Sequence, residues 1–379
     1  MIYWDNAATT YPKPRAVREA MAQALIHLGA NPGRGSYPMS LQTARMLFGC
    51  REGAGALFDA PPEAVVLTPS CTAALNTVLR GLLQGGGHAV ISDLEHNAVV
   101  RVLHALSPAH PIYDIAAVVP HDAEQTVRHF ERLLRPDTKV ICCTAASNVF
   151  GLRTPLPELY RLAQRSGIPL VVDAAQGAGL LTAQQLPCDY LCAAGHKGLY
   201  GPMGTGLLVC RTAPTFAPLL QGGTGTASRS AEQPSELPEG FESGTLNVPG
   251  FAGLAAGIGF VRAQDPAKLL ARETALMRTL HRALQGVRGI TLYTPEPDGQ
   301  YLPLLSLNIG QLPCEQAAEL LAQRGIAVRA GLHCAPLAHK KYGTLARGTV
   351  RLCPCAFTTE AQVQKTFKIL AECAGKSLQ

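Results

Sequence analysis

The amino-acid sequence predicts an α/β protein in which a mostly parallel sheet, covered by helices, is followed by a smaller α+β domain. Short apolar runs alternate with helix-like segments through the first two thirds of the chain, a pattern typical of a doubly wound sheet. Beyond residue 259 the pattern changes to a long helix followed by short strands and helices. With 379 residues, of which 47% are hydrophobic and 16% charged, the chain is long enough to bury one large core and one smaller core.

The first part of the chain contains apolar runs that we predict to be buried strands. They cover residues 65–67, 88–92, 139–143, 170–173, 190–194 and 206–210. Helices that cover this sheet are predicted at residues 70–80, 123–134 and 156–166. Ligands of such sheets bind beyond the carboxyl ends of the strands. Five polar side chains fall there, namely Thr72, His96, Asn148, Asp173 and Lys197.

The remaining segments complete the predicted organisation. Residues 221–240 are rich in Gly, Ser and Pro, and we expect them to form a mobile excursion. Later helices are predicted at 266–285, at 313–324 and from 359 onward, and later strands at 290–293, 304–309, 326–330 and 349–352. We expect three regions, namely an N-terminal segment (1–15) that packs with the small domain, a large domain (16–258) and a small domain (259–379).

Charge and composition exclude several classes of partner. The formal net charge of +6 is small for this length, and no block of five or more Lys and Arg residues occurs, so no nucleic-acid partner is expected. The most apolar stretch, residues 250–261, is too short and too rich in glycine to span a bilayer, and the N-terminus lacks a signal-like segment. We therefore expect a soluble cytoplasmic protein without a membrane partner.

The twelve cysteines are expected to be reduced thiols, because no secretory signal accompanies them. Cys142, Cys143, Cys192 and Cys210 lie in apolar strand-like runs, where cysteine behaves as a small hydrophobic residue. No two cysteines have the Cys-x-x-Cys spacing of a zinc or redox site. No metal is expected.

Two strand ends bear the side chains that a pyridoxal phosphate site requires. One apolar run ends in Asp173, and the next predicted strand is followed by His196 and Lys197. The Lys197 amine could form a Schiff base with the cofactor aldehyde, and Asp173 could pair with the pyridinium nitrogen so that the ring acts as an electron sink. Either motif alone would be weak evidence, because a buried strand can end in Asp for capping and a Lys after Gly-His is usually a solvated charge.

A phosphate ester needs backbone N–H groups at a helix N-terminus and a few hydroxyl groups. Residues 68–72, which include Cys71 and Thr72, supply both after a predicted strand. Taken on its own, this segment is better explained as an ordinary capping turn.

Together with the loop around Cys334, these motifs resemble the class V aminotransferase family, and within it the group of cysteine desulfurases and selenocysteine lyases. The resemblance runs nearly from end to end of the chain. The matching segments are residues 3–10, 95–98, 147–149, 171–176, 193–202, 241–247, 329–336 and 349–351. It implies a fold-type I pyridoxal phosphate enzyme.

The resemblance also implies roles for individual residues around the cofactor. His96 matches the histidine that stacks on the pyridine ring and can shuttle protons. Asn148 and Gln176 match residues that hydrogen-bond the substrate side or the phenolic oxygen of the cofactor. Thr72 and His196 match residues that bind the phosphate.

Two further positions concern the phosphate. The family has a serine two residues before His196, whereas this chain has Ala194, so one hydroxyl contact is missing and a weaker phosphate grip, or a substitute, is implied. Thr245 resembles a residue that reaches the phosphate of the other subunit in a homodimer.

Cys334 distinguishes this group from transaminases. A thiolate on its loop could attack the substrate sulfur, leaving alanine in the site and a persulfide on the enzyme. His333 could lower the thiol pKa or relay a proton. Arg351 would bind the substrate carboxylate bidentately, a geometry that Lys cannot reproduce, with Arg329 as its helper.

The resemblance therefore implies a homodimeric cysteine desulfurase that acts on L-cysteine. The short interval between Cys334 and Arg351 resembles the members with a compact cysteine loop that depend on a sulfur-accepting partner protein. Three alternatives stay open: a selenocysteine lyase acting on L-selenocysteine, an epimerase or transaminase that would not need Cys334, and a non-catalytic scaffold that binds a sulfur carrier. Cys353 and Cys355 depart from the family and could relay sulfur, although packing as small apolar residues is the more economical interpretation.

Overall fold

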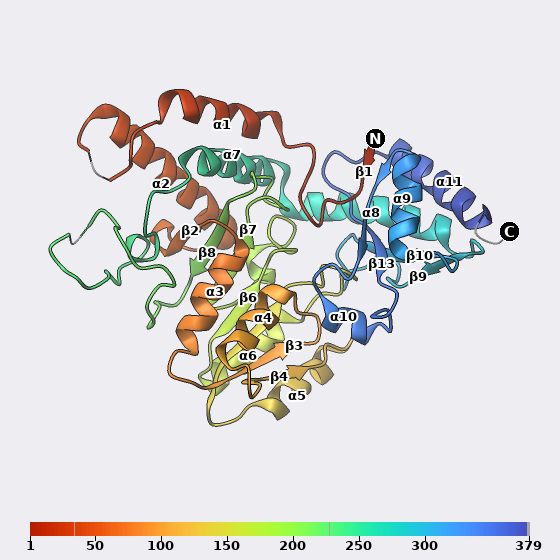
Figure 1. The fold of residues 1–379 in the computed structure, drawn as a ribbon, viewed down its shortest axis with the longest axis horizontal. Coiled ribbons are helices and arrows are strands. Elements are labelled where there is room, and N and C mark those ends of the chain that lie inside the picture. Colours follow the sequence, from red (N-terminus) through yellow and green to blue (C-terminus); the bar gives the residue numbers. More distant parts are fainter. Residues whose placement is uncertain (34, 227, 377–379) are drawn as a thin grey trace.

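The computed structural model describes residues 1–33, 35–226 and 228–376, and its largest sheet has seven strands in the order β2-β8-β7-β6-β5-β3-β4 (Figure 1). The strands are β2 (Val65–Thr68), β3 (His88–Ser92), β4 (Tyr113–Ala116), β5 (Thr138–Thr144), β6 (Leu170–Asp173), β7 (Tyr190–Ala194) and β8 (Gly206–Cys210). Neighbouring strands are parallel except that β8 pairs antiparallel with both β2 and β7. The mostly parallel sheet predicted from the sequence is confirmed.

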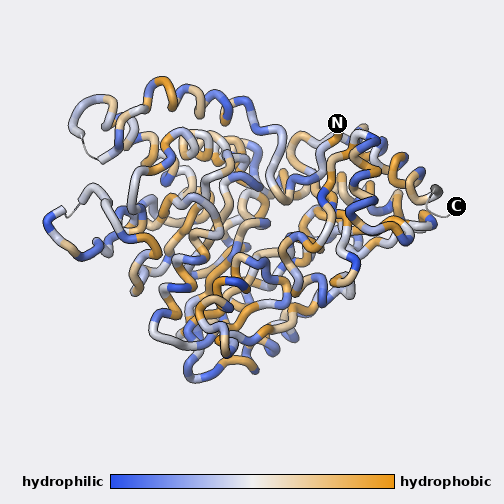
Figure 2. The backbone as a smooth tube through the Cα atoms, viewed as in Figure 1, coloured by the Kyte–Doolittle hydropathy of each residue, from blue (hydrophilic) through white to orange (hydrophobic). Residues whose placement is uncertain are grey.

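Helices cover both faces of this sheet, because side chains of successive strand residues point to opposite faces. One face packs against α3 (Cys71–Leu82) and α4 (Asn97–Leu106). The other face packs against α2 (Pro38–Phe58), α5 (Ala123–Leu133), α6 (Leu156–Ser166) and α7 (Val248–Gln264). The helix α1 (Arg15–His27) lies on the outer side of α7. Hydrophobic stretches of the chain accordingly gather inside these layers, with hydrophilic stretches toward the periphery (Figure 2).

The C-terminal part builds a second core around an antiparallel sheet with the order β12-β13-β10-β9. Its strands are β9 (Ile290–Leu292), β10 (Leu305–Ile309), β12 (Arg329–Gly331) and β13 (Thr349–Leu352). Its helices are α8 (Pro266–Leu284), α9 (Cys314–Gln323), α10 (Pro336–Lys341) and α11 (Glu360–Lys376). The N-terminal β1 (Ile2–Tyr3) joins this part by pairing in parallel with β11 (Ile326–Ala327).

The structure differs from the sequence-based expectation at several elements. The strand predicted at 326–330 is divided at Val328, because β11 pairs with β1 whereas β12 pairs with β13. The elements α1, α2, α4, α7, α10 and β4 were not predicted. In α7 the apolar residues occur all round the helix, which is buried between α1 and the sheet, so no amphipathic period marks it.

The structure bears on the predicted excursion at residues 221–240 and on the predicted division between the large and small domains. Residues 221–240 form turns and bends apart from a short 3₁₀ helix at Glu239–Phe241, and residue 227 lies outside the described residues. The division predicted between residues 258 and 259 falls within α7, so the three-region organisation stays a prediction. Residues 377–379 of the predicted small domain also lie outside the described residues. Within the described part of the chain, no helix is both long and apolar enough to cross a bilayer.

Candidate active site

Asp173 and Lys197 lie at the same edge of the large sheet. Asp173 is the last residue of β6, and Lys197 follows the end of β7, the strand that pairs in parallel with β6. The Asp173 side chain is only 3% exposed. Its Oδ1 atom accepts the backbone N–H of Ala175 at 2.9 Å and the thiol of Cys71 at 3.4 Å. The carboxylate therefore has a defined orientation at the base of the site.

The electrostatics of Lys197 suit an amine that must react in its neutral form. Burial lowers the pKa of Lys197, and the charge of Asp173 partly opposes this effect. The carbonyl of the preceding residue, His196, accepts hydrogen bonds from the Lys13 ammonium at 2.8 Å and from the Thr10 backbone N–H at 3.0 Å. The N-terminal segment thus contacts the turn that positions Lys197.

His96 lies at the N-terminus of α4 and within electrostatic range of the other candidate residues. Its Nδ1 atom accepts the backbone N–H of Ala98 at 3.0 Å, which assigns the proton of the neutral ring to Nε2. Burial lowers the pKa of His96, and the charge of Asp173 opposes this effect. A neutral ring with a free Nε2–H at ordinary pH can stack and exchange a proton.

Arg351 on β13 is almost fully buried, with 1% exposure. Its Nη2 atom forms an ion pair with Asp5 Oδ1 at 2.9 Å, and Nη1 donates to the backbone carbonyl of Asn148 at 2.8 Å. The Nε atom is buried and has no hydrogen-bond partner among the described residues. The guanidinium group is therefore fixed in place while retaining an N–H donor for a carboxylate.

Arg329 and His333 flank this guanidinium. Arg329 is the register partner of Arg351 across β12 and β13, which puts two cationic residues side by side. His333 is 3% exposed, and its Nε2 faces the carbonyl of Arg329 at 3.3 Å. Burial and the charge of Arg351 lower the pKa of His333 to about 2. The ring is neutral at ordinary pH, so a cationic effect of His333 on the neighbouring thiol is not supported, and the relay role stays a prediction.

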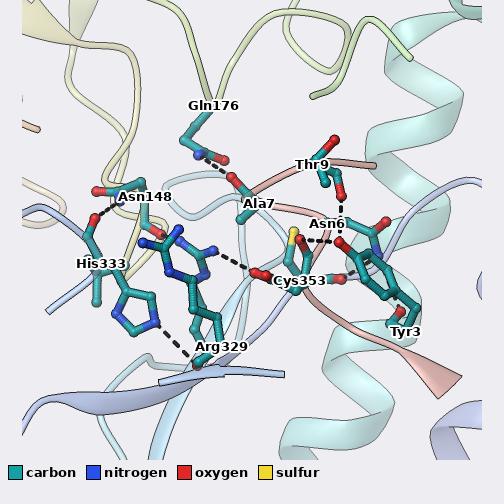
Figure 3. A network of polar contacts seen from close by, with 12 residues as sticks. Tyr3, Asn6, Ala7, Thr9, Asn148, Gln176, Arg329, His333 and Cys353 are labelled. Atoms are coloured by element: carbon teal, nitrogen blue, oxygen red, sulfur yellow. Dashed lines mark hydrogen bonds and ion pairs between the residues drawn. The ribbon is translucent and has the colours of Figure 1, made fainter. Parts of the chain in front are cut away.

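The Cys334 loop contacts segments that follow strands of the large sheet, and Cys334 is exposed. The backbone N–H of Asn97 donates to the carbonyl of Cys334 at 2.7 Å. The Asn148 side chain donates through Nδ2 to the carbonyl of His333 at 2.7 Å (Figure 3). These two bonds join the loop to the ends of β3 and β5, where His96 and Asn148 lie.

The structure gathers most of the predicted residues, with one exception. Thr72, His96 and Cys334 line one cavity of about 380 Å³. Gln176 donates through Nε2 to the carbonyl of Ala7 at 3.0 Å, which places it beside the N-terminal segment. Thr245 is exposed and lines none of this cavity. Its expected contact with the other subunit stays a prediction.

Several contributing residues were not singled out from the sequence. Asp5 pairs with Arg351, and Lys13 binds the His196 carbonyl. Both lie in or next to the N-terminal motif that carries the family resemblance, but their partners are hundreds of residues away in the chain. Glu95, next to His96, is fully buried and accepts the Thr144 backbone N–H at 2.8 Å. It lies three residues beyond the end of β3, in the segment 95–98 that carries part of the family resemblance.

The residues present fit an anionic, polar cofactor. Among the buried polar atoms that lack a partner in the described residues, four belong to residues expected to contact cofactor or substrate, namely Asn148 Oδ1, His196 Nδ1, His333 Nδ1 and Arg351 Nε. Burial lowers the pKa of His196 to about 4, so the ring is neutral and Nδ1 can accept or donate a single hydrogen bond. No group of three or more His, Cys, Asp and Glu side chains within the described ranges could bind a metal ion.

The two additional thiols, Cys353 and Cys355, follow the end of β13. The strand β13 ends at Leu352, so the strand alternation that would align Arg351, Cys353 and Cys355 does not continue. Cys353 instead forms an isolated bridge with Asp5, and Cys355 is buried. Burial raises the pKa of both thiols, which disfavours the nucleophilic thiolate form.

Comparisons with known proteins agree with this geometry. The family model described as "Aminotransferase class-V" matches residues 2–366. A probable cysteine desulfurase of Methanothermobacter thermautotrophicus is 32% identical over 99% of this chain and 95% of its own length. One from Pseudomonas putida is 34% identical over 97% of this chain and 92% of its own length. The apo structure of a cysteine desulfurase from Thermococcus onnurineus is similar with a TM-score of 0.90 and 28% identity, covering 99% of this chain and 95% of that chain.

Proposed function

Because the chain belongs to the class-V aminotransferase family, we propose that it is a pyridoxal-phosphate-dependent cysteine desulfurase. The reaction converts L-cysteine and the Cys334 thiol into L-alanine and a Cys334 persulfide. The observation that carries the proposal is the exposed Cys334, joined by the Asn97 N–H to the loop of His96, above the strand ends that bear Asp173 and Lys197. The full-length match to relatives described as cysteine desulfurases supports it.

Lys197 and Asp173 would have different roles in holding the cofactor. When bound, the cofactor supplies an electron-withdrawing ring that weakens the bond between the substrate carbon and sulfur. Lys197 would hold the cofactor covalently, and Asp173 would keep the ring nitrogen protonated. Its fixed Oδ1 contacts with Ala175 and Cys71 prevent the carboxylate from rotating away.

The substrate would be positioned by its carboxylate. Arg351 retains a buried Nε–H donor after its contacts with Asp5 and Asn148, and Arg329 adds a second positive charge. A carboxylate there would form charge-assisted hydrogen bonds in a site shielded from water. The Cys334 thiolate would then attack the substrate sulfur. The carbon that loses the sulfur would take up a proton, and His96 Nε2 is a candidate donor, given the expected place of the ring against the cofactor.

A homodimer is also proposed. Helices α1 and α2 expose large apolar side chains that a second copy would cover, namely Leu25, Ile26, Tyr37, Met39, Leu41 and Phe48. Exposed Thr245 is available to reach the site of a second copy. A cytoplasmic location is proposed as well, since all twelve cysteines are free.

Two substitutions test the function. Lys197→Ala should abolish the visible absorbance of the covalently attached cofactor, and an unchanged spectrum would refute the assignment of Lys197. Cys334→Ser should keep that absorbance but form no persulfide with L-cysteine, as judged by intact mass, whereas Cys353→Ser should still form it. Parallel alanine assays with L-cysteine and L-selenocysteine discriminate a desulfurase from a selenocysteine lyase. Full persulfide formation by Cys334→Ser would contradict the proposal.

A further inference from the structure

A cavity of about 380 Å³ is lined by Cys334, by residues along α3 and by the first turns of α4. One wall is a stripe on α3 formed by Thr72, Asn76 and Arg80, which recur every four residues and so share a helix face. The opposite wall includes Asn97 and Arg101 on α4. The inner end would face the cofactor, and the outer end bears the two arginines.

The cavity is positively charged. None of its lining residues is an Asp or Glu. Arg80 donates through Nε to Asn76 Oδ1 at 3.1 Å, which orients its guanidinium, and Arg101 is exposed. Neither arginine forms an ion pair with a carboxylate in the part of the chain that the structure describes. Both guanidinium groups are therefore available to an external anion.

The distances of Arg80 and Arg101 from the Cys334 end of the cavity indicate how long an anion would have to be to reach both the thiol and a guanidinium group. Arg80 lies two turns beyond Thr72, or about 12 Å along α3, and Arg101 lies one turn beyond Asn97, or about 6 Å along α4. The Asn97 backbone N–H is bonded to the Cys334 carbonyl at 2.7 Å, so the thiol and the arginines are one to two helical turns apart. A chain of three residues spans about 10 Å when extended. A cavity of this volume is at the lower limit for small-molecule sites.

We propose that this cavity binds the sulfur acceptor, and that the acceptor is a low-molecular-weight thiol of about tripeptide size that bears carboxylates. The inference rests on the proposed function, because it requires a persulfide on Cys334. The acceptor thiolate attacks the outer sulfur of the persulfide, a new sulfur–sulfur bond forms, and the bond to the Cys334 sulfur breaks. Cys334 leaves as a thiolate and the acceptor departs as a persulfide, so no external oxidant or reductant is needed.

The test separates loading of the persulfide from its discharge. The holoenzyme is first pulsed with L-cysteine and desalted, and the Cys334 persulfide is quantified by intact mass. Glutathione, a tripeptide thiol with two carboxylates, is then compared with its diethyl ester and with 2-mercaptoethanol as acceptors. Discharge rates are measured against acceptor concentration and normalised to the persulfide loaded in each protein.

Saturable discharge by glutathione is expected, with a much higher half-saturation concentration for the ester. Arg80→Gln and Arg101→Gln should each raise the half-saturation concentration of glutathione about 10-fold or more, in the range of a lost charged hydrogen bond. Arg132→Gln, which removes an exposed arginine on α5, has the same change in net charge and should leave the value unchanged.

Two outcomes would overturn the inference. Equal half-saturation concentrations for glutathione in the wild type and both cavity variants would exclude the arginines as carboxylate ligands. A rate that rises linearly with glutathione, as with 2-mercaptoethanol, would show that no binding site exists and would favour a protein acceptor. If no persulfide forms during the cysteine pulse, the proposed function fails together with this inference, whereas unselective discharge of a loaded persulfide removes this inference alone.

Discussion

Replacing Glu95 with glutamine tests whether a buried carboxyl group next to His96 is neutral in the folded protein. Glu95 has 0% exposure. Its Oε1 atom accepts the Ser92 hydroxyl and the Thr144 backbone N–H, the latter at 2.8 Å. Its Oε2 atom is buried and has no partner among the described residues. Burial outweighs these two hydrogen bonds and raises the pKa of Glu95 to about 8.

The raised pKa makes the stability of the protein depend on pH in a definite direction. In the unfolded chain this carboxyl group would ionise near pH 4.5, its ordinary value, whereas in the folded protein it retains its proton up to about pH 8. Between these values the folded state binds more protons, so the free energy of unfolding falls as pH rises. The slope is about 1.4 kcal/mol per pH unit, and the loss over the whole window is at most about 5 kcal/mol.

Glutamine keeps the shape of the neutral acid without its titration. Its Oε1 atom can accept the same two hydrogen bonds, and its amide nitrogen takes the place of an oxygen that has no partner in either case. The free energy of unfolding of Glu95→Gln relative to the wild type should therefore increase by up to about 4 kcal/mol from pH 5 to pH 8. Urea unfolding of both proteins at several pH values measures this difference.

Glu124→Gln, which neutralises an exposed carboxyl group on α5, is the matched control and should run parallel to the wild type. An infrared band of a protonated carboxylic acid at pH 7, lost in Glu95→Gln, provides a readout that does not require reversible unfolding. Parallel pH curves for the wild type and Glu95→Gln, with no such band, would refute the reasoning.

Two further predictions concern substrate recognition and the additional thiols. Arg351→Lys should weaken substrate binding by about 1 to 3 kcal/mol, because an ammonium group cannot bind the substrate carboxylate, Asp5 and the Asn148 carbonyl together. Spectroscopic titration with the substrate measures the loss of binding free energy. Equal reaction of cysteine and cysteamine, which lacks the carboxylate, with the wild type would contradict this role of Arg351. The double variant Cys353→Ser/Cys355→Ser should keep most of the alanine production of the wild type. If a cysteine pulse put sulfane sulfur on the wild-type peptide that contains these cysteines, and the double variant lost turnover, the two thiols would be shown to relay sulfur.

Local patterns in the sequence were sufficient to predict six of the seven strands of the large sheet, all but β4, and to place Asp173 and Lys197 at its carboxyl edge. Asp173 and Lys197 follow strands that are apolar throughout, and parallel neighbours such as β6 and β7 end at one edge. The pairing of Arg351 with Asp5 could not be predicted in the same way. It depends on β1 pairing with β11, which brings the N-terminal segment beside β13, and a two-residue strand has no periodicity of its own.

The family resemblance located Cys334 in the sequence, but it did not predict the unusual backbone conformation of the loop that holds this residue. His333 and Cys334 both have left-handed backbone conformations, with φ values of 50° and 57°, although neither is glycine. Such a conformation costs roughly 1–2 kcal/mol per residue. The amino-acid types of these two residues do not predict a left-handed conformation, because contacts with distant elements hold them in it.

Those contacts lie at the strained residues themselves and at the end of the helix that follows them. Before α10, Asn148 and the Asn97 N–H bind the two carbonyls of the strained pair. At the C-terminal end of α10, Lys341 forms an ion pair with Asp93 at 2.7 Å and donates to the Val118 carbonyl at 2.6 Å. Charge-assisted contacts of this kind can offset the backbone cost. Because these contacts restrain the segment that carries the Cys334 thiol, an acceptor must come to Cys334, and the arginine-lined cavity beside it is where an anionic acceptor would be oriented.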